Sequence, residues 1–400
     1  MGLAALTRRM HTSPFATHKS LRVLRWAVCL VTCALGIVIV SAQQSLPPLV
    51  VARPITPPRH PLPSEAKSAG ESRFAFVVYG DTRSGTAAEN DAPYPPHERV
   101  IATMLATIKE RSRTHMPVRF VAQTGDAVFR AADGLMWNAS YTPAIEQLTR
   151  GADLPYFLTA GNHDVTAAPA GNPARAQALN NTLAAMSRLI PPEGSPRRLN
   201  GYLTYAFGYG SLFAIAIDTN IASDPLQLAW VTDQLEHLDR RRFPIVVALM
   251  HHPPYSSGPH GGPRVIEAPT RGVRELYMPL FRRHHVRLVL AGHEHFFEQW
   301  IERYEDGGQP YRMDTIVTGG GGAPTYTYRG EPDLNAYLAA GAAQKVRVEH
   351  LAKPGATIPE NPNHFVVLTV DGNRLTEDVV ASGNAPFAPF GGKSQIELTN

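Results

Sequence analysis

The stretch LTAGNHDV, residues 158–165, ends a short apolar run at Gly161 and then places an amide, an imidazole and a carboxylate side by side. These groups belong to Asn162, His163 and Asp164. Glycine followed by asparagine is common turn chemistry, because asparagine tolerates unusual backbone angles. Taken alone, the stretch is compatible with an ordinary turn as well as with a functional site. Other parts of the sequence distinguish these two interpretations.

Four other apolar runs end in similar residues. Two close with Gly-Asp, one with a pair of histidines and one with Gly-His-Glu-His. Short apolar runs bounded by turn residues are typical of buried strands. Five neutral turns of this shared composition would be an unusual coincidence, which favours the functional interpretation. The four runs are RFAFVVYGD (73–81), VRFVAQTGD (118–126), FPIVVALMHH (243–252) and VRLVLAGHEH (286–295).

Segments with the apolar spacing of helices lie between these runs, and hairpins follow toward the end of the chain. This order predicts an α/β fold with mixed sheets. In open α/β sheets, ligands bind beyond the carboxyl ends of the strands. We therefore expect the polar strand ends to meet at one rim. Helices are expected at 97–112, 174–190, 224–241 and 273–285, and strand pairs at 202–219, 311–322 and 363–380.

The side chains at this rim are carboxylates, an amide and imidazoles. Both cysteines, Cys29 and Cys33, lie in a separate apolar segment near the start of the chain, so the body has no thiolate ligand to offer. Oxygen and nitrogen donors without sulfur suit Zn, Mn, Fe or similar ions. More than four donors indicate two divalent or trivalent ions about 3.5–4 Å apart.

The five blocks resemble, in order, those of the calcineurin-like metallophosphoesterases: Asp-x-His, Gly-Asp, Gly-Asn-His-Asp/Glu, His and Gly-His-x-His. The resemblance spans roughly residues 73–300 and includes features of the purple acid phosphatase branch. It implies a four-layer α/β/β/α sandwich of two mixed sheets. It also implies a dinuclear metal site and hydrolysis of a phosphoester by a metal-activated hydroxide.

The resemblance assigns a role to each block residue. Asp126 would bridge the two metals; Asp81 and His295 would bind the first, and Asn162, His251 and His293 the second. His163 would help the leaving oxygen to depart, and Asp164 would orient His163. A histidine beside a carboxylate suits this work, since the charge raises its pKa toward working pH.

The first block departs from the family pattern, because Arg83 stands where a ligand histidine is usual. The purple acid phosphatases also lack this histidine but carry a tyrosine three residues after the bridging aspartate, where this chain has Phe129. A guanidinium does not ligate a cation, so the first metal loses a ligand. Arg83 either contacts the substrate phosphate through paired hydrogen bonds or forms a structural salt bridge.

The segment HHPPYSSGPH, residues 251–260, also resembles the purple acid phosphatase branch, in which a histidine about ten residues after the ligand meets the substrate. His260 is this candidate, with a solvated loop histidine as the alternative, and His252 is expected to be structural. The segment favours a phosphomonoester substrate. A phosphodiesterase or nucleotidase remains the alternative, as does a metal-binding homologue that has lost turnover through Arg83.

The start of the chain has the pattern of an export leader. Residues 1–25 hold five basic residues and no acid, and the apolar run 26–42 ends in Val-Ser-Ala, which favours cleavage before Gln43. A retained membrane anchor is the alternative, and both place the body outside the cytoplasm, in the periplasm or beyond. This leader accounts for the net charge of +4, so nucleic-acid binding is not expected.

These patterns divide the chain into four parts. We expect a signal peptide or anchor at 1–42, a Pro-rich linker at 43–72, the metallophosphoesterase domain at 73–382 and a flexible tail at 383–400. The expected partner is a small phosphoester substrate.

Overall fold

The computed structural model describes residues 50–86, 92–165, 173–261, 266–391 and 395–398. The expected leader and the first part of the expected linker lie outside these ranges. None of the helices in these ranges combines the length and the apolar composition of a membrane span.

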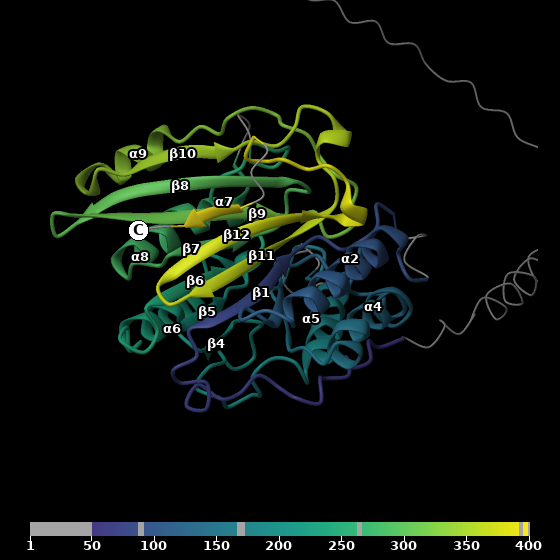
Figure 1. Ribbon diagram of the computed structural model, residues 1–400. Coiled ribbons are helices and arrows are strands. Elements are labelled where there is room, and N and C mark those ends of the chain that lie inside the picture. Colours follow the sequence, from purple (N-terminus) through teal and green to yellow (C-terminus); the bar gives the residue numbers. More distant parts are fainter. Residues whose placement is uncertain (1–49, 87–91, 166–172, 262–265, 392–394, 399–400) are drawn as a thin grey trace, which may run out of the picture. The chain divides into compact units, whose positions relative to one another are not determined.

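Two mixed β-sheets form the centre of the domain (Figure 1). The first has the order β13-β12-β11-β1-β2-β3, with β1, β2 and β3 parallel to one another. It comprises β1 (Arg73–Tyr79), β2 (Val118–Gln123), β3 (Tyr156–Leu158), β11 (His364–Asp371), β12 (Arg374–Ala381) and β13 (Gln395–Leu398).

The second sheet has the order β10-β8-β9-β7-β6-β5-β4. Strands β5, β6, β7 and β9 are parallel, and antiparallel strands flank them. It comprises β4 (Tyr205–Tyr209), β5 (Leu212–Ala216), β6 (Ile245–Leu249), β7 (Leu288–Ala291), β8 (Phe297–Asp306), β9 (Gln309–Thr318) and β10 (Arg347–Ala352).

Alternating side chains explain why the sheets stack. In β5, Leu212 and Ala214 join the same apolar cluster as Phe76 and Phe120 of the first sheet. Their neighbours Phe213 and Ile215 point the other way, into a second apolar cluster that includes residues of the helices packed on the outer face of the second sheet. Because successive strand residues face opposite sides, a strand that is apolar on both faces must be covered on both.

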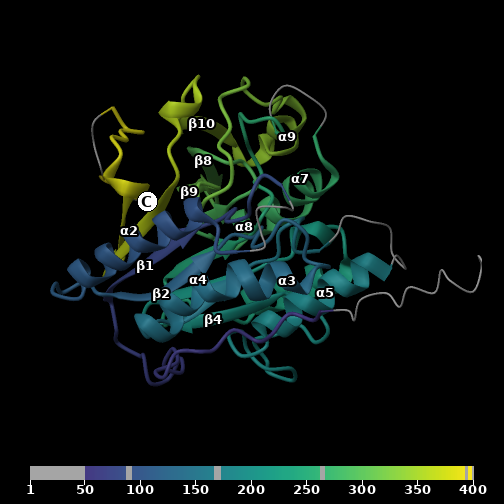
Figure 2. The same cartoon turned by 90° about the vertical axis from the view of Figure 1, so that its right-hand side faces the viewer.

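Helices cover the outer face of each sheet, which completes four α/β/β/α layers as expected. Helices α2 and α4 lie over β1 and β2 (Figure 2), and side chains of α6 and α8 pack on the second sheet. The helices are α2 (Pro95–Arg111), α3 (Gly134–Met136), α4 (Thr142–Glu146), α5 (Pro173–Met186), α6 (Pro225–Glu236), α7 (Ala268–Gly272), α8 (Met278–Arg283) and α9 (Asn335–Ala340).

The described part of the expected linker is not a free tether. Ile55 is fully buried, and its N–H donates to the Ala185 carbonyl of α5 at 3.0 Å. Arg53 pairs with Glu146 of α4 at 2.7 Å. The many prolines do prevent helix and sheet, as expected, but an extended chain still buries apolar side chains and pairs its backbone. Residues 50–63 are therefore part of the domain.

The expected C-terminal tail also contains structure. Strand β13 pairs antiparallel with β12, and its Leu398 is fully buried against the first sheet. The run QIEL is too short to indicate a strand from sequence alone. It becomes a strand because the fold places β12 beside it.

Candidate metal centre

The residues expected at the rim do meet, and each follows the carboxyl end of a strand. The first sheet delivers three of them and the second sheet the other three. One contact ties the two sheets together, because the His293 backbone N–H donates to Asp81 Oδ2 at 2.9 Å. The residues are Asp81 after β1, Asp126 after β2, Asn162 after β3, His251 after β6, and His293 and His295 after β7.

The backbone at this rim is strained. Asp81, Asp126 and His293 have φ values of 58°, 56° and 72°, in the left-handed region that side chains with a Cβ seldom adopt. Such conformations cost on the order of 1–3 kcal/mol each and persist where the surrounding structure enforces them. Their coincidence at three expected ligands indicates that the fold is built to aim these side chains.

Glycines beside the expected ligands allow neighbouring strand ends to approach closely, in addition to allowing the chain to turn. A Cβ on Gly161 would lie 2.3 Å from the Asp126 backbone nitrogen, and a Cβ on Gly292 would lie 2.5 Å from Asp81 Oδ2. A side chain at either position would push the strand ends apart. The recurrent glycine in the sequence blocks is therefore a packing requirement of the site.

Two of the histidines are fixed by backbone carbonyls. His251 Nδ1 lies 2.8 Å from the Thr124 carbonyl oxygen, and His295 Nδ1 lies 2.7 Å from that of Pro324. A carbonyl only accepts hydrogen bonds, so both Nδ1 atoms carry a proton. In the neutral rings the Nε2 atoms then hold a lone pair that faces the rim.

The third histidine is held by a carboxylate that sequence reasoning missed. His293 Nε2 lies 2.9 Å from Glu267 Oε2, which leaves Nδ1 to face the rim. Metal-ligating histidines commonly donate their second N–H to such a carboxylate. Burial lowers the pKa of His293, but the hydrogen bond to Glu267 and the charges of Glu294, Glu267 and Asp126 together outweigh burial and leave the pKa raised. A proton on His293 would thus compete with a metal ion.

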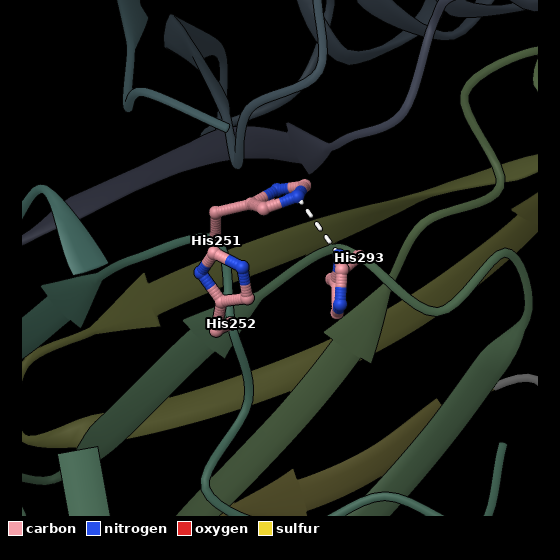
Figure 3. Close-up of side chains that lie close together, drawn as sticks. All are labelled: His251, His252 and His293. Atoms are coloured by element: carbon pink, nitrogen blue, oxygen red, sulfur yellow. Dashed lines mark hydrogen bonds between the residues drawn. The ribbon is translucent and has the colours of Figure 1, made fainter. Parts of the chain in front are cut away.

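Four donors converge on one point. His251 Nε2 lies 2.8 Å from Asn162 Oδ1, 3.2 Å from His293 Nδ1 and 3.4 Å from Asp126 Oδ1. Figure 3 shows a ring nitrogen of His251 directed at a ring nitrogen of His293. Burial lowers the pKa of His251, which keeps its ring neutral. Lone pairs that converge in a buried place require a cation, so these residues fit the second metal of the family pattern.

The other donor set is Asp81, Asp126 and His295, whose donor atoms lie within 4.8 Å of one another. Asp81 Oδ1 is buried without a hydrogen-bond partner and lies 3.4 Å from His295 Nε2. Arg83 enters this set. Its Nε donates to Asp126 Oδ2 at 3.0 Å, so the structure pairs Arg83 with a ligand carboxylate rather than leaving it free.

The expected contact between Asp164 and His163 is wrong. The Asp164 carboxylate accepts hydrogen bonds from the N–H groups of Asp126, Ala127 and Gly161, at 2.8 to 2.9 Å. His163 Nδ1 instead lies 2.6 Å from the Phe129 carbonyl. Adjacent residues on a tight turn point apart, so Asp164 organises the backbone around Asp126 while the His163 side chain contacts Phe129.

His260 lies beside the converging donors. Its ring is 4.4 Å from that of His293, and 32% of its side chain is exposed. The buried Glu294, the unassigned residue of the Gly-His-Glu-His block, accepts the His260 backbone N–H at 2.9 Å. His252 Nδ1 lies 2.8 Å from Thr219 Oγ1, and His252 also offers a donor atom within 4.8 Å of those of His251 and His293 (Figure 3).

A model of the calcineurin-like phosphoesterase family matches residues 75–297. The chain belongs to this family. The resemblance inferred from the five blocks is therefore confirmed, and family membership implies a metal site of two ions and action on phosphoesters.

Curated relatives of this family member come from Arabidopsis thaliana. Purple acid phosphatase 23 is 26% identical over 268 residues, covering 65% of this chain and 55% of that protein. Probable purple acid phosphatase 20 is 29% identical over 157 residues, covering 38% of this chain and 34% of that protein. This chain thus spans roughly a third to a little over half of these relatives.

Among solved structures, the fold is similar to that of purple acid phosphatase PPD1 from yellow lupin (Lupinus luteus) seeds. The TM-score is 0.57 at 18% identity, covering 85% of this chain and 55% of that one. This likeness confirms the predicted fold class.

Proposed function

We propose that this protein is an exported, metal-dependent hydrolase of phosphoesters with a preference for monoesters. The observation that carries the proposal is the convergence of three donor atoms on His251 Nε2. Asn162 Oδ1, His293 Nδ1 and Asp126 Oδ1 lie 2.8 to 3.4 Å from this nitrogen. The identity of the metal, Mn, Zn, Fe or similar, is left to experiment. When bound, the metal centre would polarise the phosphate and activate a water for attack.

The protein's own contribution to catalysis is to place a proton near the leaving oxygen. His163 is the candidate, because its Nδ1–H is engaged by the Phe129 carbonyl and its Nε2 is the atom that exchanges protons with the site. The backbone N–H of His163 donates to Asp126 Oδ1 at 2.9 Å, so the backbone of His163 is fixed relative to this proposed metal ligand. General acids held in this way contribute about 10²–10⁴-fold to rate.

Monoester preference rests on His260. Its ring is held at the rim by Glu294 and remains partly exposed, so it is able to bind an unesterified phosphate oxygen. A phosphodiester has one fewer such oxygen and would use this contact less well.

The experiment is hydrolysis by the purified protein loaded separately with Mn²⁺, Zn²⁺, Fe³⁺ or Ni²⁺. A chromogenic phosphomonoester and the matching diester are offered in parallel, each with a chelated control. Faster, chelator-sensitive turnover of the monoester supports the proposal. Faster diester turnover would assign a phosphodiesterase, and metal binding without turnover of either ester would assign a non-catalytic binding protein.

Export rests on the leader at residues 1–42, which lies outside the described residues. Mass spectrometry of the protein recovered from its natural host tests this part. A mature N-terminus at Gln43 is expected, an intact leader in the membrane fraction would indicate an anchor, and an intact leader in the cytosol would contradict export.

A further inference from the structure

We infer that the Arg83 guanidinium takes the place of the first metal ion, so that each chain binds a single metal through Asp126, Asn162, His251 and His293. This inference rests on the proposed function, since it concerns the same site. It departs from the two-ion pattern of the family and assigns Arg83 as the fixed cation of the centre.

The guanidinium contacts the donors that a first ion would need. Arg83 Nε lies 3.0 Å from Asp126 Oδ2, and Nη2 lies 3.5 Å from His295 Nε2. Asp81, Asp126 and His295 form the first donor set among the described His, Asp and Glu side chains. Two of these three donors are therefore already turned toward a positive charge.

The two oxygens of Asp126 are divided between the halves of the site. Oδ1 lies 3.4 Å from His251 Nε2, on the side of the second donor set, whereas Oδ2 receives Arg83. A bridging carboxylate would direct itself to a metal on each side. Here Oδ2 already faces a guanidinium, and only Oδ1 is left to bind an ion.

Groups beyond the donor set hold Arg83 in place. Nη1 donates to the Ser84 carbonyl at 3.3 Å, and the guanidinium carbon lies 5.7 Å from the centre of the Phe129 ring. Only 11% of the Arg83 side chain is exposed. A side chain fixed by a carbonyl, a ring and a carboxylate is preorganised for this position.

Charge opposes a metal ion at the same place. A divalent ion bonded to Asp126 and His295 at about 2.0–2.2 Å would lie within a few ångströms of the guanidinium. Like charges this close in a buried site repel strongly. Arginine does not escape by losing its proton at ordinary pH.

The test counts ions in the purified full-length protein, stripped of metal and titrated with Mn²⁺. Equilibrium dialysis gives the stoichiometry, and electron paramagnetic resonance separates isolated Mn²⁺ from an exchange-coupled pair. We expect one isolated ion in the wild type. Arg83→His should bind two coupled ions, whereas Arg83→Lys, which keeps the charge, should remain at one.

Circular dichroism establishes that each variant is folded. If Arg83→His does not fold, Arg83→Ala replaces it and should gain a weaker second ion on Asp81, Asp126 and His295. Two coupled ions in the wild type would overturn the inference, and so would a single ion in every folded variant. One ion without hydrolysis would refute the proposed function but leave this inference standing, whereas two ions with hydrolysis would do the reverse.

Discussion

His293 is oriented by Glu267, whose Oε2 lies 2.9 Å from His293 Nε2 while the opposite ring nitrogen faces His251. The carboxylate fixes which nitrogen is protonated and so which one is available to a metal. Removing such a partner typically reduces metal affinity about 10–100-fold.

We therefore expect Glu267→Gln to bind Mn²⁺ or Zn²⁺ about 10–100-fold more weakly, as measured by isothermal titration calorimetry. The matched control is Glu275→Gln, an exposed glutamate in the same helical region, which should bind like the wild type. Unchanged metal affinity in Glu267→Gln would show that Glu267 does not contribute to metal binding.

Proton competition gives the metal affinity a pH dependence. The pKa of His293 is raised because the Glu267 hydrogen bond and the nearby carboxylate charges outweigh burial, so protons displace metal as the pH falls. Affinity measured by competition with a chromophoric chelator should fall between pH 7.5 and pH 5.5. The fall should be smaller in Glu267→Gln, whose His293 has lost the neighbouring charge; an equal fall in both proteins would place the competing proton elsewhere.

His163 is expected to matter most for poor leaving groups. With His163→Asn, kcat for an alkyl phosphate should drop about 10²–10⁴-fold, with a smaller drop for a nitrophenyl phosphate, whose leaving group needs no proton. Exposed His115→Asn is the control. Equal losses on the two substrates would show that His163 binds phosphate instead of supplying a proton.

Asp164 is expected to support stability through the loop of Asp126. Asp164→Ala leaves three buried N–H groups without an acceptor, and each such group costs about 1–3 kcal/mol. Urea unfolding should show a loss of at least a few kcal/mol, and Asp164→Asn, which keeps an acceptor oxygen, should lose less. An Asp164→Ala protein with wild-type stability but no activity would show that Asp164 acts in catalysis and not in stability.

Residues 50–63 are expected to stabilise the domain. Ile55→Ala deletes a fully buried side chain and should cost about 2–5 kcal/mol in urea unfolding. Val51→Ala is the control, since Val51 is 53% exposed and should change stability little. If both variants were equally stable, the segment would be a loosely attached tether after all.

The site was predictable from sequence where chemistry and strand ends coincide. Asp81, Asp126, Asn162 and His251 each follow an apolar run, and local patterns of this kind are visible without a structure. Glu267 was not predictable, because it follows no strand and meets His293 only through the fold.

The same reason applies to two other features that the sequence did not reveal. The partner of Arg83 lies 43 residues away, and Ile55 is covered by a helix more than a hundred residues later in the chain. Composition correctly excluded regular structure in the Pro-rich stretch, but it carries no information about what such a stretch packs against.

The measurement that tests the central claim most directly is phosphomonoester hydrolysis by the metal-loaded protein before chelation, after chelation and after metal is restored, with Asn162→Ala alongside. Asn162 Oδ1 is one of the converging donors, and its loss removes a ligand without leaving a buried charge. We predict that turnover disappears on chelation, returns with metal, and stays far below wild type in folded Asn162→Ala. Turnover that survives chelation, or full activity in Asn162→Ala, would contradict the account.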